Sequence, residues 1–200
     1  MNMILITLKL LNLNLIIMEL PTADNCWTDS TQEHNPELFQ KASHILESNL
    51  YCTLSTASPD GEPWVSPVFF AFDQQWHLYW CSAVASKHSQ NIEQNQGKVA
   101  VAIFDSTVSE ATGKGLYFYG IAQQVQTELL PLVLELTYQR SSKLRKMKTA
   151  EDFAVDSVRQ LYQFVPEKAW LTGERLPVGD HLVDTKIAID LKWCNLQEKH

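Results

Sequence analysis

The sequence predicts a mainly β protein, an antiparallel barrel with helical additions. Runs rich in β-branched and aromatic residues recur between residues 51 and 127, and short polar turns or one short helix separate them. Hairpins in series at this spacing favour an antiparallel barrel over alternating parallel strands and helices. With 200 residues, 45% of them hydrophobic, the chain can form one domain with a substantial core.

The elements follow in order along the chain. Asn35 and Pro36 are typical of a helix start, and apolar residues at helical spacing carry this helix to about residue 49. Strands are expected at 51–56, 64–72 and 76–82, the first two joined by a Ser-Pro-Asp-Gly turn at 58–61. A short helix at 86–95 and strands at 99–104 and 116–127 follow, with Gly120 marking a bulge or a close backbone approach.

The sequence predicts a higher helix content in the second half of the chain than in the first. We expect helices at 129–138 and 150–164, the second of them ended by Pro166, then a last barrel strand at 168–172 and a β-like run at 186–191. The expected organisation is an apolar then irregular segment at 1–35, one barrel domain at 36–194 with a helical insertion at about 129–164, and a tail at 195–200. The basic run 140–148 is either a solvated segment or a docking site for an anionic substrate.

The first twenty residues are mostly Leu, Ile and Met, with Lys9 as the only cation. Three interpretations remain open: an over-extended gene start with Met18 as the initiator, a membrane anchor or signal, and a hydrophobic arm. A membrane partner is expected only if this segment is retained as an anchor.

Charge and cysteine usage narrow the class of protein. The net charge of −7 disfavours binding to nucleic acid. The four cysteines lie far apart and form no C-x-x-C pair, which predicts inert thiols in a reducing compartment, hence a cytoplasmic location, and no metal site.

The end of the third strand carries the candidate site. Ser82 ends that strand, and Ser86 and Lys87 follow at the start of a helix. Helix N-termini have free N–H groups and a positive dipole end, so this arrangement predicts a phosphate cradle. Three plainer interpretations remain open: Ser86 as a helix cap, Lys87 as a solvated lysine and His88 as a surface residue.

The stretch Ala85-Ser86-Lys87-His88 is similar to the G-S-R-K pattern of the pyridoxamine 5'-phosphate oxidase family, and VPEKAWLTG at 165–173 is similar to its late strand. Residues 36–128 resemble the FMN-binding split β-barrel of that family. The resemblance implies a homodimer with FMN in a groove between the protomers. It also implies cofactor-binding roles for Ser66, Pro67, Val68, Cys81, Ser82, Ser86, Lys87, His88 and Trp170, which otherwise are ordinary strand, helix and packing residues.

Two departures from the family pattern concern the substrate. The flavin strand of the vitamin B6 oxidases begins with Arg and ends with Lys, whereas Ser66 and Ala71 occupy those places here. The Arg-x-His pattern after the late tryptophan is replaced by 173–176, Gly-Glu-Arg-Leu. We therefore expect the broader oxidase-related group and not an enzyme that acts on pyridoxamine phosphate.

The resemblance leaves three functions open. The first is an FMN-dependent oxidoreductase acting on an unidentified small molecule, for which no side chain is singled out as catalytic. The second is a non-catalytic module that binds a flavin, a deazaflavin or haem, with His77, His88 and His181 as haem candidates. The third is a barrel without cofactor that acts only in assembly. A homodimer is expected for all three, because a split barrel leaves apolar surface to be covered.

Overall fold

A computed structural model of the chain describes residues 20–141, 148–153, 156–192 and 194. The apolar stretch 1–19, on which the interpretations of the N-terminus depend, and the tail 195–200 lie outside the described residues. Within the described ranges, no helix has both the length and the apolar character needed to cross a membrane.

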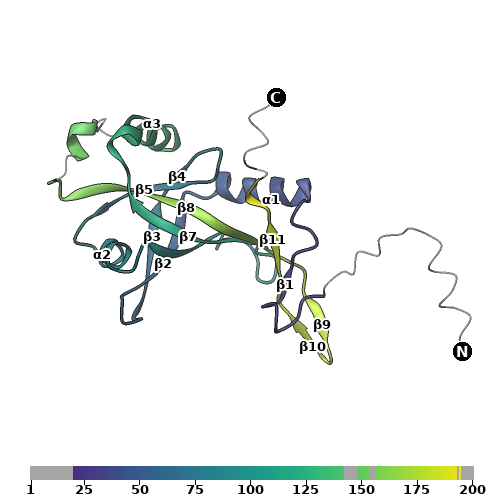
Figure 1. Cartoon of the computed structure of the whole chain (residues 1–200). Helices are drawn as coiled ribbons and strands as arrows, with labels where there is room; N and C mark the ends of the chain where they lie inside the picture. Colours follow the sequence, from purple (N-terminus) through teal and green to yellow (C-terminus); the bar gives the residue numbers. More distant parts are fainter. Residues whose placement is uncertain (1–19, 142–147, 154–155, 193, 195–200) are drawn as a thin grey trace, which may run out of the picture.

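One large sheet dominates the molecule (Figure 1). Its order is β1-β11-β8-β7-β6-β2-β3, and β5 pairs with β8 and with the short β4. Every pair is antiparallel except β1 with β11, so the mainly β, antiparallel architecture is confirmed. The strands are β1 (Thr28–Asp29), β2 (Tyr51–Ala57), β3 (Pro63–Phe69), β4 (Ala71–Phe72), β5 (Leu78–Ala83), β6 (Lys98–Phe104), β7 (Gly115–Gln124), β8 (Arg159–Thr172) and β11 (Lys186–Ile189).

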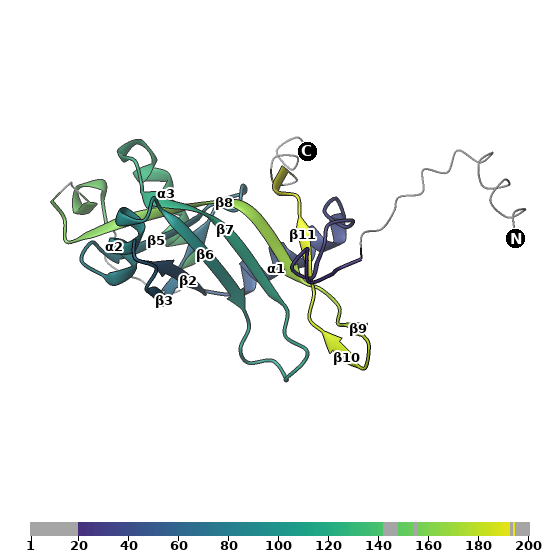
Figure 2. The ribbon, with the colours of Figure 1, turned by 60° about the horizontal axis from the view of Figure 1, so that its bottom comes forward.

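A separate hairpin, β9 (Leu176–Val178) with β10 (His181–Val183), projects from the body beside the β6–β7 loop (Figure 2). The apolar then irregular segment predicted at 1–35 did not include β1, and neither β9 nor β10 was expected. All three are short strands whose pairing depends on tertiary neighbours, so local sequence gives them little signal.

The first helix, α1 (Pro36–Ser48), is confirmed with its predicted ends. The Asn35 side chain accepts a hydrogen bond from the Glu37 amide at 2.9 Å, and Pro36 occupies the first turn. The buried face of the helix packs on β6 and β7. A stack of Phe39 on Trp76, with ring centroids 4.5 Å apart, fixes it against the end of the barrel.

The remaining helices cover the sheet at its split end. They are α2 (Lys87–Gln94), the 3-10 turn η2 (Thr127–Leu129), α3 (Leu130–Arg140) and the 3-10 turn η3 (Ala150–Phe153). Alternate residues of the half-buried strands contribute to the core, such as Cys52, Leu54 and Thr56 of β2. A second apolar cluster lies between β5 and α3 and includes Tyr79, Val133, Phe153 and Leu161.

The prediction of a helix at 150–164 was wrong. Only η3 is helical there, and the 14-residue strand β8 begins at Arg159. Residues 160–164 are buried on both faces, the barrel interior on one side and the α3 cluster on the other, so the sequence shows no alternation that would indicate a strand. Pro166 does not end an element but lies within β8 at a bulge.

Candidate functional site

The barrel is split between β3 and β5. Strand β3 pairs only with β2, and β5 pairs with β8 on one edge and with β4 only at Leu78 and Tyr79. Among the described residues, no strand pairs with residues 80–83 on the edge of β5 that faces away from β8, or with β3 on the edge that faces away from β2. Backbone groups on such edges are available to a ligand. A cavity of about 680 Å³ lies between them, lined by Pro67–Phe69 and Tyr79–Ala83.

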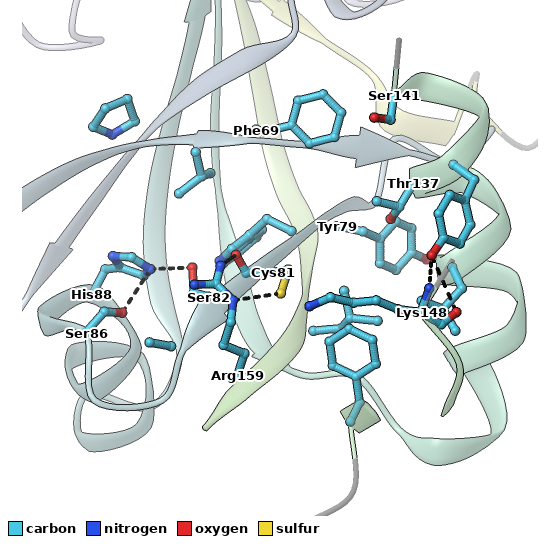
Figure 3. A pocket seen from close by; sticks show the side chains of 18 residues that line it. Phe69, Tyr79, Cys81, Ser82, Ser86, His88, Thr137, Ser141, Lys148 and Arg159 are labelled. Atoms are coloured by element: carbon cyan, nitrogen blue, oxygen red, sulfur yellow. Dashed lines mark hydrogen bonds between the residues drawn. The ribbon is translucent and has the colours of Figure 1, made fainter. Parts of the chain in front are cut away.

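The other walls come from the helices (Figure 3). The start of α2 contributes Ser86 and His88 at one end, and α3 and η3 close the opposite end with Leu134, Thr137, Tyr138 and Phe153. A volume in this range and a mixture of aromatic walls with few polar groups are typical of a small-molecule site.

His88 is the centre of a cluster of hydroxyl groups, the serine–histidine cluster of His88, Ser66, Ser82, Ser86 and Ser89. Its Nε2 lies 2.7 Å from Ser82 Oγ and 3.1 Å from Ser86 Oγ, and its Nδ1 lies 3.1 Å from Ser66 Oγ. Ser86 Oγ also donates to Ser89 Oγ at 2.9 Å. Burial lowers the pKa of the His88 imidazole below its usual value, so at neutral pH the ring is an uncharged partner of these hydroxyls.

Most of the predicted cofactor residues meet at this cavity. Pro67, Val68, Cys81, Ser82, Ser86 and His88 line it, and Ser66 reaches it through its contact with His88. Trp170 does not: it lies on the distant half of β8, opposite Tyr117 of β7 and Ala188 of β11. Within one protomer, Trp170 therefore does not reach the cavity in which the flavin is expected.

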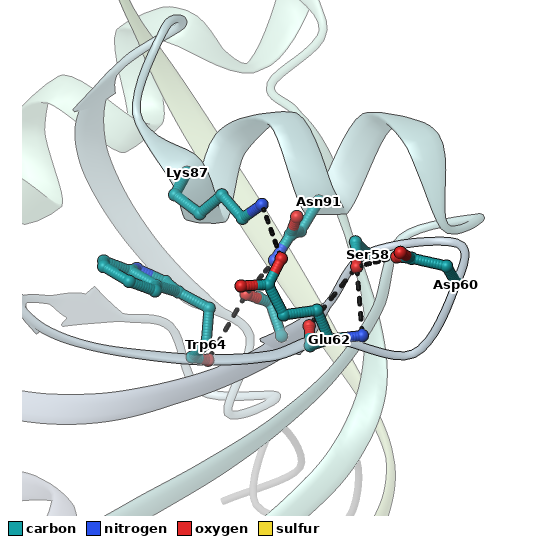
Figure 4. Close-up of polar contacts among 7 residues, drawn as sticks. Ser58, Asp60, Glu62, Trp64, Lys87 and Asn91 are labelled. Atoms are coloured by element: carbon teal, nitrogen blue, oxygen red, sulfur yellow. Dashed lines mark hydrogen bonds and ion pairs between the residues drawn. The ribbon is translucent and has the colours of Figure 1, made fainter.

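Lys87 is also absent from the lining. Its Nζ lies 3.3 Å from Glu62 Oε2, across the turn that joins β2 to β3 (Figure 4). Successive residues on a helix point about 100° apart, which turns Lys87 away when His88 faces the cavity. The ammonium group is thus engaged by a carboxylate and not placed for a phosphate in the cavity.

We expect the single variant Lys87→Ala to cost less than about 1 kcal/mol in the free energy of unfolding, because exposed ion pairs contribute little. Ligand affinity is expected to fall less than in Ser82→Ala, whose hydroxyl lies in the cavity wall. Urea denaturation and ligand titration of both variants check this. A larger loss of affinity in Lys87→Ala would show that the lysine swings from Glu62 into the cavity on binding.

Two cations in the lining were not among the predicted cofactor-binding residues. The Arg159 guanidinium donates through Nη2 to the Cys81 carbonyl at 3.0 Å, and its Nε lies 3.5 Å from Cys81 Sγ. Lys148 extends from the α3 side toward the centre of the cavity, its Nζ 5.1 Å from the Phe153 ring centroid (Figure 3). The basic run 140–148 was a signal for Lys148, whereas the mispredicted helix at 150–164 concealed Arg159.

Tyr79 forms a second polar network in the wall. Its hydroxyl donates to Asp73 Oδ2 at 2.9 Å and accepts from Gln163 Nε2 at 3.2 Å, while His77 Nδ1 lies 2.8 Å from the same Asp73 oxygen. Burial by itself raises the pKa of Asp73, but the hydrogen bonds from His77 and Tyr79 outweigh it and hold that pKa below its usual value. Burial and the Asp73 charge raise the pKa of Tyr79, which stays a neutral phenol.

The histidines offer poor axial positions for haem. Of the three candidates only His88 lines the cavity, and both of its ring nitrogens already face hydroxyls. His77 is held by Asp73, and His181 is exposed on β10. Across the described ranges, no group of three or more His, Cys, Asp or Glu side chains is placed to hold a metal ion.

Similar folds occur in solved structures of low sequence identity. A putative 5-nitroimidazole antibiotic resistance protein from Bacteroides thetaiotaomicron matches with a TM-score of 0.54 and 14% identity, over 66% of this chain and 81% of that one. The haem-binding protein of Mycobacterium smegmatis gives 0.56 and 15%, over 76% and 58%. The haem storage protein HutZ of Vibrio cholerae gives 0.53 and 21%, over 66% and 89%. At these identities the likeness shows the fold alone.

The sequence comparisons are more selective. No curated protein sequence matches this chain. The family model described as pyridoxamine 5'-phosphate oxidase matches residues 38–172, which span α1 through the end of β8 and so include β3, β5, α2 and the whole cavity. This chain therefore belongs to the pyridoxamine 5'-phosphate oxidase family.

Proposed function

We propose that the cavity in the split binds FMN and that the protein is an FMN-dependent oxidoreductase acting on a small molecule. The proposal rests on one observation: the edges of β3 and β5 that have no partner strand both face the same cavity, and the serine–histidine cluster lies at one end of it. A planar ring between two such edges can receive backbone hydrogen bonds from both, and flavin rings need donors and acceptors of this kind.

The residues present fit the rest of the cofactor. Ser82, Ser86 and His88 offer hydroxyl and imidazole donors for a phosphate at one end of the cavity, and the half-buried Phe69 offers apolar surface to a ring. Arg159 and Lys148 supply positive charge in the lining. FMN, when bound, supplies the electron transfer, and the protein holds the ring, excludes water from it and neutralises the phosphate.

We further propose that the protein is a cytoplasmic homodimer. Tyr51, Val65 and Phe104 are more than half exposed, and the strand register places all three on the outer face of the β2, β3 and β6 sheet. An apolar face of this kind favours a second copy as its cover. Sedimentation of the full chain is expected to give twice the monomer mass, and a monomer at all concentrations would contradict the proposal.

The direct test is purification of the full chain without added cofactor, followed by an absorption spectrum and the mass of any released ligand. Flavin bands and the mass of FMN are the expected result. If the preparation is colourless, FMN and haemin are titrated separately. A Soret band, or binding of haemin with no binding of FMN, would overturn the proposal in favour of a haem-binding module.

A further inference from the structure

We propose that the cavity takes up a proton together with its phosphate ligand, and that His88 is the group that is protonated. This inference rests on the proposed function, because it places the phosphate of FMN at the serine–histidine cluster. It makes the affinity for the cofactor fall as the pH rises through the neutral range, where a site built from Lys or Arg would keep its charge and show no such dependence.

The cluster can accommodate both charge states of His88. Each ring nitrogen faces a serine hydroxyl: Ser82 and Ser86 at Nε2, 2.7 and 3.1 Å away, and Ser66 at Nδ1, 3.1 Å away. A hydroxyl can donate or accept, so rotation of its hydrogen satisfies either the neutral ring or the imidazolium. The Trp64 indole donates to Ser66 Oγ at 3.0 Å, which leaves that oxygen's own hydrogen free to turn. Protonation therefore requires no rearrangement of the walls.

The surroundings keep the ring neutral until an anion arrives. Strands β2, β5 and β7 carry no charged residue. The charged groups around the cluster on other elements include Glu62 beside β3, Lys87 on α2 and Arg159 on β8, and the Cys81 thiol of β5 lies in the same cavity lining. Glu62 and Lys87 form an ion pair with each other. Burial is the cause of the lowered pKa of His88, and no carboxylate offsets it.

A phosphate dianion changes this balance. An opposite charge within about 4–6 Å favours the charged form of a group and shifts its pKa by roughly 1–3 units. The pKa of His88 is below its usual value in the free cavity and is raised in the complex. At a pH below the free-state pKa the ring is already charged, and the affinity does not respond. Between the two pKa values binding takes up a proton, so the dissociation constant rises with pH by up to about tenfold per unit.

The experiment is calorimetric titration of FMN into the full chain at pH 7.5 in buffers of different ionisation enthalpy, with affinities also measured from pH 7 to 8.5. The second ionisation of a phosphate monoester lies near pH 6, so in this range FMN itself is a dianion and contributes little to the proton count. We expect net proton uptake and a dissociation constant that rises with pH. Riboflavin, which lacks the phosphate, is expected to bind without proton uptake.

Variants assign the proton to His88. His88→Asn is expected to bind FMN without proton uptake and with an affinity that no longer changes with pH. Arg159→Gln removes a permanent charge from the same cavity and is expected to weaken binding while the uptake remains. His181→Asn, on the exposed β10, is expected to behave as the unaltered protein. The histidine ring signals of the unaltered protein, followed by NMR as FMN is added, give the same answer if His88→Asn fails to fold.

Two failures are distinguishable. If FMN binds but no proton is taken up, or if the uptake survives in His88→Asn, the inference is overturned and the proposed function stands. If FMN does not bind at any pH, the proposed function is overturned and this inference with it.

Discussion

Replacement of Arg140 by alanine is expected to lower the free energy of unfolding by about 3 kcal/mol and to weaken ligand binding in the cavity. Arg140 is the last residue of α3, and its Nη2 donates to the carbonyl oxygens of Leu46 and Asn49 at the end of α1. Those carbonyls belong to a helix C-terminus and have no partner within the helix. The guanidinium carbon also lies 4.7 Å from the ring centroids of both Phe70 and Phe72.

The magnitude follows from these contacts. Leaving a partly buried carbonyl without a donor costs roughly 1–3 kcal/mol, and a cation over an aromatic ring contributes about 0.5–2 kcal/mol. The effect on binding follows from position, because α3 supplies Leu134, Thr137 and Tyr138 to the cavity wall. Once α3 is no longer held to α1 and β4, that wall loses its fixed geometry. Ordering the wall on binding then costs free energy, which lowers the affinity for the ligand.

Urea denaturation and ligand titration of three variants test this expectation. Arg140→Lys keeps the charge but cannot reach two carbonyls with one planar fork, so an intermediate loss is expected. Arg175→Ala is the matched control, since Arg175 pairs with Asp184 at 2.8 Å on the exposed hairpin and should cost less than about 1 kcal/mol. Equal stability of Arg140→Ala and Arg175→Ala would show that Arg140 does not hold the helices together.

The parts of the fold that sequence predicted well are those with local chemical causes. Asn35 and Pro36 set the start of α1 through a side-chain cap and a fixed φ, whatever the rest of the chain does. The turn at 58–61 is likewise local: Gly61 adopts a φ of +91°, and its amide donates to the Ser58 carbonyl at 2.9 Å. The first half of β8 had no such signal, because residues 160–164 are covered on both faces, whereas its second half was predicted as a strand at 168–172.

The sequence indicated which residues lie near the candidate site better than it indicated which of their side chains face the cavity. Ser82, Ser86 and His88 meet as expected, whereas Lys87 turns to Glu62, which lies 25 residues earlier in the chain. Which of two adjacent helical residues faces a cavity depends on how the helix rotates against β2 and β3, and that depends on non-local packing. Arg159 reaches the cavity only because β8 pairs with β5, so that Ala83 and Arg159 are opposite one another.

Gly120→Ala is expected to destabilise the protein by about 3 kcal/mol or more, although it adds a single methyl group. β7 and β8 are out of register at this point: Tyr119 pairs with Lys168 but Gly120 pairs with Pro166, so β8 carries one extra residue. A Cβ on Gly120 would collide with the Val165 carbonyl oxygen and would lie 2.9 Å from Phe164 Cζ and from Pro166 Cα.

Two of those three neighbours are backbone atoms in the middle of a sheet, so they cannot move aside as a flexible side chain would. The bulge also explains how a proline is tolerated inside β8, because the ladder is interrupted there and the missing N–H costs nothing further. The matched control is Gly113→Ala in the β6–β7 loop, where the nearest atom would be 3.6 Å away and the change should be within about 0.5 kcal/mol. Thermal and urea denaturation of the two variants measure the difference; if they unfold alike, the close approach at Gly120 is not what constrains the β7–β8 pairing.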